Sequence, residues 1–266
     1  MQDIPVVILC GGQGTRMRGN TLTKKELVEI GGRPVIWHVM RIFSAHGCRR
    51  FILTLGFQAE QLRRYFLEYE AMHRDFTVQL GEPDNRVHPS QLEFLGAVDH
   101  PAWEVTLVDT GLYTEKGSRI ARVAPYLEEE ERFFVSYGDD VSDVDLTALV
   151  AFHRQHGRQA TVTSVQVDFQ YGVLEADASD CVTAYHQYPR LPYWINGGFM
   201  LFERPVLDLF ADGDEVKLES DVLVRLTAAG QLMRYRHDGF WQSMNTMKDN
   251  LLLEELWQQG APWKVW

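Results

Sequence analysis

The chain has 266 residues, a formal net charge of −11 and a sequence pI near 5.3. An acidic balance of this size argues against a nucleic-acid-binding surface, so a phosphate ligand would require a local basic pocket. Three unevenly spaced cysteines without a CxxC pair indicate neither a disulfide framework nor a zinc site. No apolar run reaches the ~18 residues that span a bilayer, and no basic segment with a cleavage site begins the chain. We therefore expect a soluble cytoplasmic protein with no membrane partner.

Apolar runs typical of strands alternate with segments of helical period along the chain. The predicted strands are Val6–Leu9, Phe51–Leu55, Phe133–Tyr137 and Ala160–Val167, and the predicted helices are Val35–Ala45, Ala59–Glu70, Asp145–His156 and Val206–Leu209. This order predicts an α/β, Rossmann-like fold, in which helices cover both faces of a mostly parallel sheet. We expect one domain over residues 1–266, with an irregular excursion from the sheet around residues 81–120.

A glycine-rich turn follows the first predicted strand. Gly11, Gly12 and Gly14 lack the Cβ atoms that would keep an oligophosphate away from the backbone, and Arg16 adds a positive charge. The turn lacks the Lys-Ser/Thr ending of a P-loop, and Met17 stands where a dinucleotide-binding fingerprint requires glycine. The sequence therefore predicts a phosphate-binding loop of another kind.

A second polar loop, 138–143, follows the predicted strand Phe133–Tyr137. Ligands of parallel α/β sheets bind beyond the carboxyl ends of the strands. We therefore expect this loop and the glycine-rich turn to meet over one crevice.

Six motifs, which come in one order along the whole chain, resemble those of the glucose-1-phosphate cytidylyltransferases, a branch of the sugar-nucleotide pyrophosphorylases. They are GGQGTR at 11–16, VEIGGRPVIWH at 28–38, WEVTLVDTG at 103–111, YGDD at 137–140, INGGF at 195–199 and APWKVW at 261–266. The resemblance implies that a phosphate oxygen of an acceptor attacks the α-phosphorus of CTP and that pyrophosphate leaves. Such a reaction needs aligned, neutralised phosphates and Mg²⁺ and no protein nucleophile.

The resemblance also implies which residues bind the nucleotide and which are catalytic. Nucleotide binding is expected of Leu9, Gly11, Gly12, Gly14, Thr15, Arg16, Lys25, Thr106, Asp109, Thr110, Gly138 and Asp139. Catalytic roles are expected of Arg16, Lys25 and Asp139. The family builds its cytidine pocket partly from a neighbouring subunit, which implies a homo-oligomer, with a hexamer as the expected form.

The predicted metal ligands depart from the family pattern. Asp139 matches one metal aspartate, but the second is Asn245, whose amide oxygen brings no charge to a hard cation. Asp140 stands where the family has glycine and could restore the carboxylate, although adjacent side chains at a strand end usually point apart. We therefore expect a weakened Mg²⁺ site at Asp139 and Asn245.

Lys25 matches the lysine of the family's Pro-Lys-Pro, but its neighbours are Lys24 and Glu26. Because two conformationally restricted residues are lost, the sequence predicts a looser loop.

The predicted acceptor-binding residues also depart from the pattern. They are Tyr171, Gly172, Gln187, Tyr188, Asn196, Gly197 and Glu219. The family's Glu-Lys-Pro reads Gln187, Tyr188 and Pro189 here, so a carboxylate for sugar hydroxyls and a lysine for the sugar phosphate are absent. We therefore hypothesise that CMP is transferred to a phosphorylated acceptor other than glucose 1-phosphate. Two alternatives are a true glucose-1-phosphate cytidylyltransferase, which makes CDP-glucose, and a catalytically weakened nucleotide-binding paralogue with a regulatory role.

Overall fold

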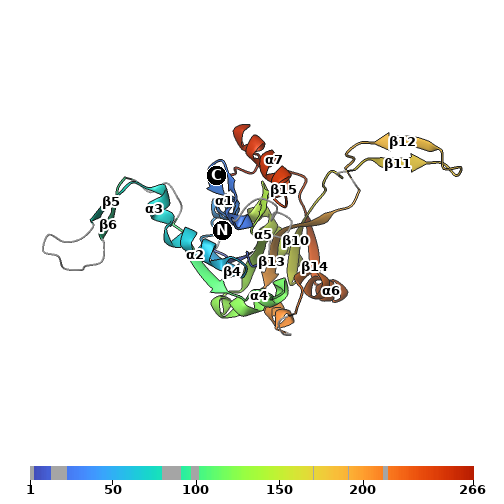
Figure 1. The fold of residues 1–266 in the computed structure, drawn as a ribbon. Helices are drawn as coiled ribbons and strands as arrows, with labels where there is room; N and C mark the ends of the chain where they lie inside the picture. The colour runs from blue at the N-terminus through green and yellow to red at the C-terminus, as the bar shows by residue number, and fades with distance from the viewer. Residues whose placement is uncertain are drawn as a thin grey trace.

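A computed structural model of the chain describes residues 3–12, 23–79, 91–96, 102–169, 171–190, 192–211 and 215–266. The strands of its central sheet are β1 (Val6–Leu9), β4 (Arg50–Leu55), β7 (Glu104–Asp109), β8 (Arg132–Tyr137), β10 (Ala160–Val165), β13 (Ile195–Glu203) and β14 (Leu232–Arg236). These seven strands are ordered β14-β10-β13-β8-β1-β4-β7 (Figure 1). Only β13 runs antiparallel to its neighbours. The predicted mostly parallel α/β fold is confirmed.

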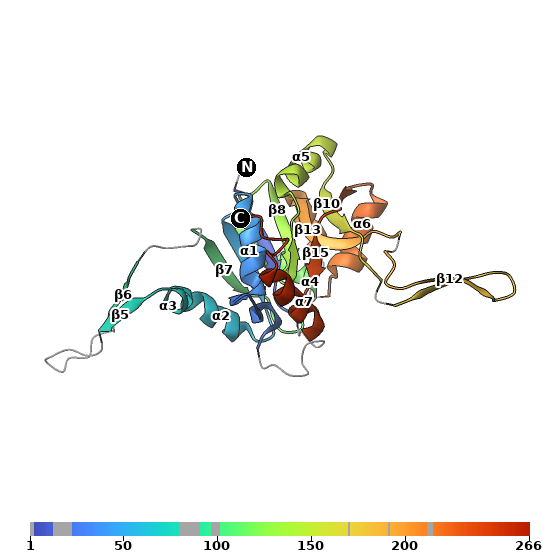
Figure 2. The ribbon, with the colours of Figure 1, turned by 90° about the horizontal axis from the view of Figure 1, so that it is seen from above.

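Each face of the sheet packs against its own apolar core. Along β1, Val6 and Ile8 belong to one core and Val7 and Leu9 to the other, as the period of two in a strand requires. The first core is covered by helices α1 (Val35–Ala45), α5 (Leu146–His156) and α7 (Met247–Gln258), and the second by α4 (Lys116–Val123), α6 (Leu223–Ala228) and the short helical segments η4 (Arg204–Phe210) and η5 (Leu218–Val222). Helices thus cover both faces, as predicted (Figure 2).

The predicted excursion around residues 81–120 is wrong in its second half. Residues 104–109 form β7, which pairs in parallel with β4 at the edge of the main sheet, and residues 116–123 form α4. Because an edge strand is only partly buried, β7 lacks the continuous apolar run that identified the central strands. In the first half, β6 (Gln91–Phe94) pairs with β5 (Phe76–Gln79), and the residues 80–90 and 97–101 lie outside the described residues.

Predicted boundaries hold best where elements are buried. β1 and α1 begin and end at the predicted residues. The predicted helix 59–70 is instead two helices, α2 (Ala59–Leu67) and α3 (Tyr69–His73), which meet at Glu68. The predicted helix 206–209 is the 3-10 segment η4, with a proline in its first turn. Among the described residues, every helix is too short or too polar to cross a membrane.

Two hairpins project from the body of the molecule on opposite sides (Figures 1 and 2). One contains β5 and β6 and continues from α3. The other is the ribbon of β11 (Val173–Ala176) and β12 (Val182–His186), which carries the exposed apolar side chains Leu174, Val182 and Tyr185. An isolated two-stranded ribbon is only marginally stable in water. Packing of these exposed side chains against another surface would therefore stabilise the ribbon.

His38 on α1 lies buried in a cluster of tryptophans near the C-terminus. The indole N–H of Trp263 donates to its Nδ1 (3.3 Å), so Nε2 carries the proton that is donated to the Ile30 carbonyl (2.9 Å). The rings of Trp257 and Trp263 lie 5.0 and 5.9 Å from the imidazole. Burial lowers the pKa of His38 to about 4, because the loss of solvation of the imidazolium outweighs its hydrogen bonds to the backbone of Ile30 and Arg33.

We predict that His38 makes the fold acid-sensitive. Its pKa is lower in the folded than in the unfolded chain, so its stabilisation is complete above pH 6.5 and is lost as the pH falls toward 4. The loss should amount to ~3 kcal/mol of unfolding free energy, measured by urea denaturation across this range. The His38→Gln variant should lose this part of the pH dependence, whereas His186→Gln, on the exposed ribbon, should keep it. An identical pH profile for wild type and His38→Gln would contradict the assignment.

Candidate active site

A cavity of about 710 Å³ opens at the carboxyl ends of β1 and β8. Eight of the predicted site residues line it, and these are Leu9, Gly11, Gly12, Lys25, Asp139, Asn196, Glu219 and Asn245. The lining also contains charged and aromatic residues that were not among the predicted site residues, and they include Glu26, Lys116, Arg119, Tyr137 and Trp241. The expected convergence of the two loops over one crevice is therefore present.

Lys25 connects the two predicted metal ligands. Its ammonium forms an ion pair with Asp139 and donates to the amide oxygen of Asn245 (3.0 Å). It lies on η2 (Lys25–Leu27), a single 3-10 turn. Residues 220 positions apart in the sequence thus meet, and two oxygen atoms converge on one cation.

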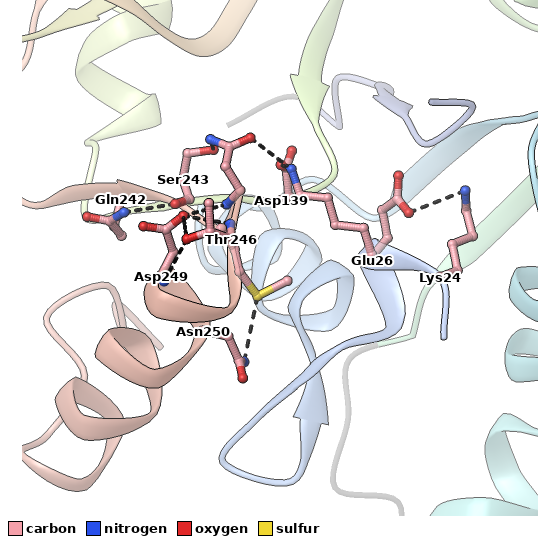
Figure 3. A network of polar contacts seen from close by, with 11 residues as sticks. Lys24, Glu26, Asp139, Gln242, Ser243, Thr246, Asp249 and Asn250 are labelled. Atoms are coloured by element: carbon pink, nitrogen blue, oxygen red, sulfur yellow. Dashed lines mark hydrogen bonds and ion pairs between the residues drawn. The ribbon is translucent and has the colours of Figure 1, made fainter. Parts of the chain in front are cut away.

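Backbone pairing brings Asn245 beside Asp139. Strand β9 (Asp140–Ser142) pairs with β15 (Trp241–Ser243), and the Met244 amide donates to the Asp139 carbonyl (2.9 Å). Beyond β15, a capping box between Thr246 and Asp249 begins α7 (Figure 3). The same Asp249 carboxylate accepts a hydrogen bond from the backbone N–H of Asn245 (2.9 Å), so the start of α7 fixes the backbone of Asn245.

Asp140 lines the same cavity as Asp139, although only 3% of it is exposed. Asp139 lies in the tight turn between β8 and β9, and Asp140 is the first residue of β9. Burial and the charge of Asp139 raise the pKa of Asp140 well above its ordinary value, against a hydrogen bond from Ser243. The site thus contains two adjacent carboxyl groups and one amide.

A second group of lining residues presents hydrogen-bonding groups around Tyr137. The Tyr137 hydroxyl donates to Glu219 (2.8 Å) and accepts from the Asn196 amide (3.4 Å), and Lys116 forms an ion pair with Glu219. Burial raises the pKa of Glu219, but the hydrogen bonds from Lys116 and Tyr137 outweigh it and leave the pKa below its ordinary value. Glu219 is therefore an anionic acceptor, suited to a ligand's hydroxyl groups.

Of the remaining predicted nucleotide-binding residues, those that the structure describes do not line the cavity. Gly14, Thr15 and Arg16 lie outside the described residues. Thr106 is paired within β7, Asp109 is exposed beside Arg63, and Thr110 is fully buried. Gly138 lies behind the cavity, where a Cβ atom would come within 3.1 Å of the Cys10 sulfur and 3.0 Å of the Glu26 side chain.

The structure does not bring four of the predicted acceptor-binding residues to the cavity. Tyr171, Gly172, Gln187 and Tyr188 lie at the base of the β11–β12 ribbon and project with it. Gln187 accepts from the Tyr185 hydroxyl (2.6 Å), and Tyr188 is 58% exposed. A fifth residue, Gly197, accepts from the indole N–H of Trp241 (2.8 Å) without lining the cavity. Sequence matching could not detect this, because it carries no information on which way a ribbon projects.

Lys24 and Glu26 do not loosen the loop around Lys25, contrary to the expectation from the missing prolines. Only 2% of Lys24 and 7% of Glu26 are exposed, and their charged groups lie 3.3 Å apart. The Lys24 ammonium also donates to the Phe57 carbonyl (2.8 Å), and its backbone N–H donates to Gln61 (2.8 Å). Figure 3 shows this pair beside the Asp139 network. A buried ion pair and a backbone hydrogen bond thus hold the loop, and proline could form neither.

Comparisons with known proteins agree with this geometry. Residues 5–252 match the sequence profile of the family described as nucleotidyl transferase. The glucose-1-phosphate cytidylyltransferase of Salmonella typhi is 40% identical over 263 residues, which is 98% of each chain. A probable glucose-1-phosphate cytidylyltransferase of Bacillus subtilis (strain 168) is 34% identical over 98% of this chain and 99% of its own. The chain therefore belongs to the nucleotidyl transferase family, and the resemblance seen in the sequence is confirmed.

A solved structure supports the fold independently. HddC from Yersinia pseudotuberculosis superposes with a TM-score of 0.68 and covers 96% of this chain and 99% of its own. The two sequences are 20% identical, so the likeness concerns the fold alone. The α/β architecture of this chain is thus shared with a solved structure.

We predict that removing one partner of the buried ion pair strongly destabilises the fold. Lys24→Met should lower the free energy of unfolding by about 3 kcal/mol, because Glu26 would remain buried without a counter-charge. The double variant Lys24→Met, Glu26→Leu should recover most of this loss in urea denaturation. As a matched control, Arg64→Met breaks the exposed pair with Glu68 and should cost less than about 1 kcal/mol. Equal losses in the two single variants would show that burial of the Lys24 pair does not matter.

Proposed function

We propose that this nucleotidyl transferase transfers CMP from CTP to a sugar 1-phosphate and releases pyrophosphate. The observation that carries the proposal is that two chemically distinct groups of residues line one cavity. Gly11, Lys25 and Asp139 provide backbone N–H groups, a cation and a carboxylate. Glu219 and Asn196 provide hydroxyl-binding groups. The 40% identity with a named glucose-1-phosphate cytidylyltransferase supports cytidine as the base.

The chemistry requires only positioning and charge neutralisation. An oxygen of the acceptor phosphate attacks the α-phosphorus of CTP, a new P–O bond forms, and the bond from the α-phosphorus to the bridging oxygen breaks in line. The electron pair of that bond leaves with pyrophosphate. Lys25, when it turns from Asp139 to the phosphates, would neutralise charge that develops in the transition state. Backbone N–H groups of the glycine-rich turn would hold the triphosphate.

The residues present fit a bound Mg²⁺ ion. The Asp139 carboxylate and the Asn245 amide oxygen already converge on the Lys25 ammonium, and both are oxygen donors of the kind that Mg²⁺ prefers. No group of three or more His, Cys, Asp or Glu side chains that could hold a metal occurs in the described part of the chain. This agrees with an ion that keeps its waters and binds substrate phosphates. Such an ion would supply positive charge to the phosphate oxygens.

A second candidate is transfer of CMP to a phosphorylated acceptor that is not glucose 1-phosphate. The observation that favours it is the presence of Gln187 and Tyr188 where the family has glutamate and lysine. These two residues lie on the projecting ribbon, outside the cavity, whereas Glu219, Asn196 and Lys116 line it. The geometry within one chain therefore gives more support to a sugar phosphate.

We also propose that the chain forms a homo-oligomer, for which the resemblance implies a hexamer. The two projecting hairpins support this, because both expose apolar side chains away from the body of the molecule. On one they include Phe76, Val78 and Leu92, and on the other Leu174, Val182 and Tyr185. Contact with other copies would bury these side chains.

The decisive experiment measures pyrophosphate release with each nucleoside triphosphate and a panel of phosphorylated acceptors. We expect release with CTP and glucose 1-phosphate, and none from Asp139→Ala. Equal rates with CTP, UTP, dTTP, ATP and GTP would contradict the cytidylyl assignment. Activity with CTP but only with another phosphorylated acceptor would favour the second candidate, and Gln187→Glu, Tyr188→Lys should then gain activity with glucose 1-phosphate. A chain that binds CTP without any turnover would be the weakened paralogue.

We predict that Asn245→Asp raises the affinity for Mg²⁺ in the presence of CTP. The substitution adds a second full charge beside Asp139, and carboxylates bind hard cations more strongly than amides do. Calorimetric titration with Mg²⁺ should show a severalfold tighter complex. Gln242→Glu adds the same charge outside the cavity lining and should leave the affinity unchanged. An unchanged affinity in Asn245→Asp would indicate that Asp140 or the triphosphate already supplies the ligand.

A further inference from the structure

Lys116 lines the cavity but was not among the predicted site residues. It is the first residue of α4, and 46% of its side chain is exposed. Two other cationic residues occur among the described residues of the lining. They are Lys25, whose side chain is 17% exposed and is engaged by two oxygen donors, and Arg119, which is buried. Lys116 is therefore the most accessible of the three to an incoming ligand.

The contacts of Lys116 contribute little to the stability of the fold. Its ammonium lies 5.0 Å from the centroid of the Tyr137 ring and forms an ion pair with Glu219. Both side chains of this ion pair are partly exposed, and such pairs stabilise a protein only weakly. A positive charge at the first residue of a helix is also unfavourable beside the positive end of the helix dipole. Neither packing nor helix stability thus explains a lysine at this position.

Tyr137 brings Lys116 close to the two adjacent aspartates of the cavity. A Cβ atom at Gly198, whose φ is +70°, would lie 3.1 Å from an oxygen of the Asp140 carboxyl group and 3.1 Å from the Tyr137 ring. The carboxyl group and the ring therefore lie side by side around this glycine. Lys116 is separated by one aromatic ring from the turn at Asp139 and Asp140, beside which the proposed function places the phosphates.

The contact between Lys116 and Glu219 matches the chemistry of a sugar 1-phosphate. Such a molecule carries an anion on carbon 1 and a hydroxyl group on carbon 2, so a cation and a hydrogen-bond acceptor in mutual contact can bind both. Tyr188, which stands where the family has a lysine for the sugar phosphate, lies on the projecting ribbon outside the cavity. Within one chain, the cavity thus contains a lysine at a different position.

We propose that Lys116 binds the phosphate of the acceptor while Glu219 accepts a hydrogen bond from the adjacent hydroxyl group. The inference rests on the proposed function and adds an acceptor class, the aldose 1-phosphates with a free hydroxyl group on carbon 2. Lys116 turns from Glu219 to the acceptor, as Lys25 turns from Asp139 to the triphosphate. Each of the two anions that meet for the in-line attack then has its own lysine.

The first test compares three lysine variants. Lys116→Met should raise the KM for glucose 1-phosphate at least about tenfold, the effect of one charge-assisted hydrogen bond, and leave the calorimetric Kd for CTP unchanged. Lys116→Arg keeps the charge and should recover most of the loss. Lys217→Met is the matched control, because it removes the same charge from an exposed residue near Glu219 and outside the cavity lining. It should change the KM less than about twofold, since exposed charges are screened.

The second test separates binding of the phosphate from mere support of Glu219. Wild type should prefer glucose 1-phosphate to 2-deoxyglucose 1-phosphate, and Glu219→Gln should lose most of this preference. Lys116→Met should keep the preference while the KM rises for both acceptors. Loss of the preference in Lys116→Met would show that Lys116 acts only by holding Glu219, and would overturn its role in binding the acceptor phosphate.

The two tests also distinguish this inference from the proposed function. Wild type that releases no pyrophosphate from CTP with any phosphorylated acceptor would overturn the proposed function and the role of Lys116 with it. Active wild type, together with folded Lys116→Met of unchanged KM for the acceptor, would overturn the role of Lys116 alone.

Discussion

The contact of the Lys25 ammonium with Asp139 and Asn245 is the interaction on which the geometry of the site depends. The three residues come from the turn after the glycine-rich segment, the end of β8 and the start of α7, and no local sequence signal joins them. Two local structures bring these residues together, namely the pairing of β9 with β15 and the capping box of α7. Because a cation already lies between two oxygen atoms, a second cation can enter only as Lys25 turns toward an anion. Under the proposed function, nucleotide and metal binding would thus be linked through this one side chain.

Two cationic side chains, Arg119 and Lys24, are buried near the cavity. Carbonyl groups at the ends of parallel strands lack partners within the sheet. Here the Arg119 guanidinium donates hydrogen bonds to the carbonyls of Leu55, Gly111 and Leu112. Lys24 does the same for Phe57 while it pairs with Glu26. Two buried cations, Lys24 and Arg119, thus satisfy carbonyl groups near the carboxyl ends of the strands.

Periodicity predicted the central strands and α1 well, because β1, β4, β8 and α1 are buried on regular faces. It failed for β7 and for the break at Glu68, where partial exposure weakens the pattern. Motif matching located Lys25, Asp139, Asn245 and Glu219, whose positions depend on strand ends that the fold fixes. It could not locate Arg119, since an arginine on an amphipathic helix normally points to water, and only the missing Cβ atoms of Gly11 and Gly56 reveal the space for it. It also misjudged Lys24 and Glu26, because an ion pair between near neighbours is not visible in the residue types alone.

The β11–β12 ribbon shows where a one-chain description of the site ends. Gln187 and Tyr188 are held by local features, a hydrogen bond from Tyr185 and a left-handed backbone at Tyr188 (φ 53°), rather than by contacts with the cavity. Under the proposed homo-oligomer, a ribbon that projects from one copy would carry these residues to another. Residues 187 and 188 would then act on an acceptor in a neighbouring cavity, whereas Glu219, Asn196 and Lys116 would act in their own. Acceptor recognition would accordingly depend on assembly, whereas the contacts of Lys25 and Arg119 described above are made within a single chain.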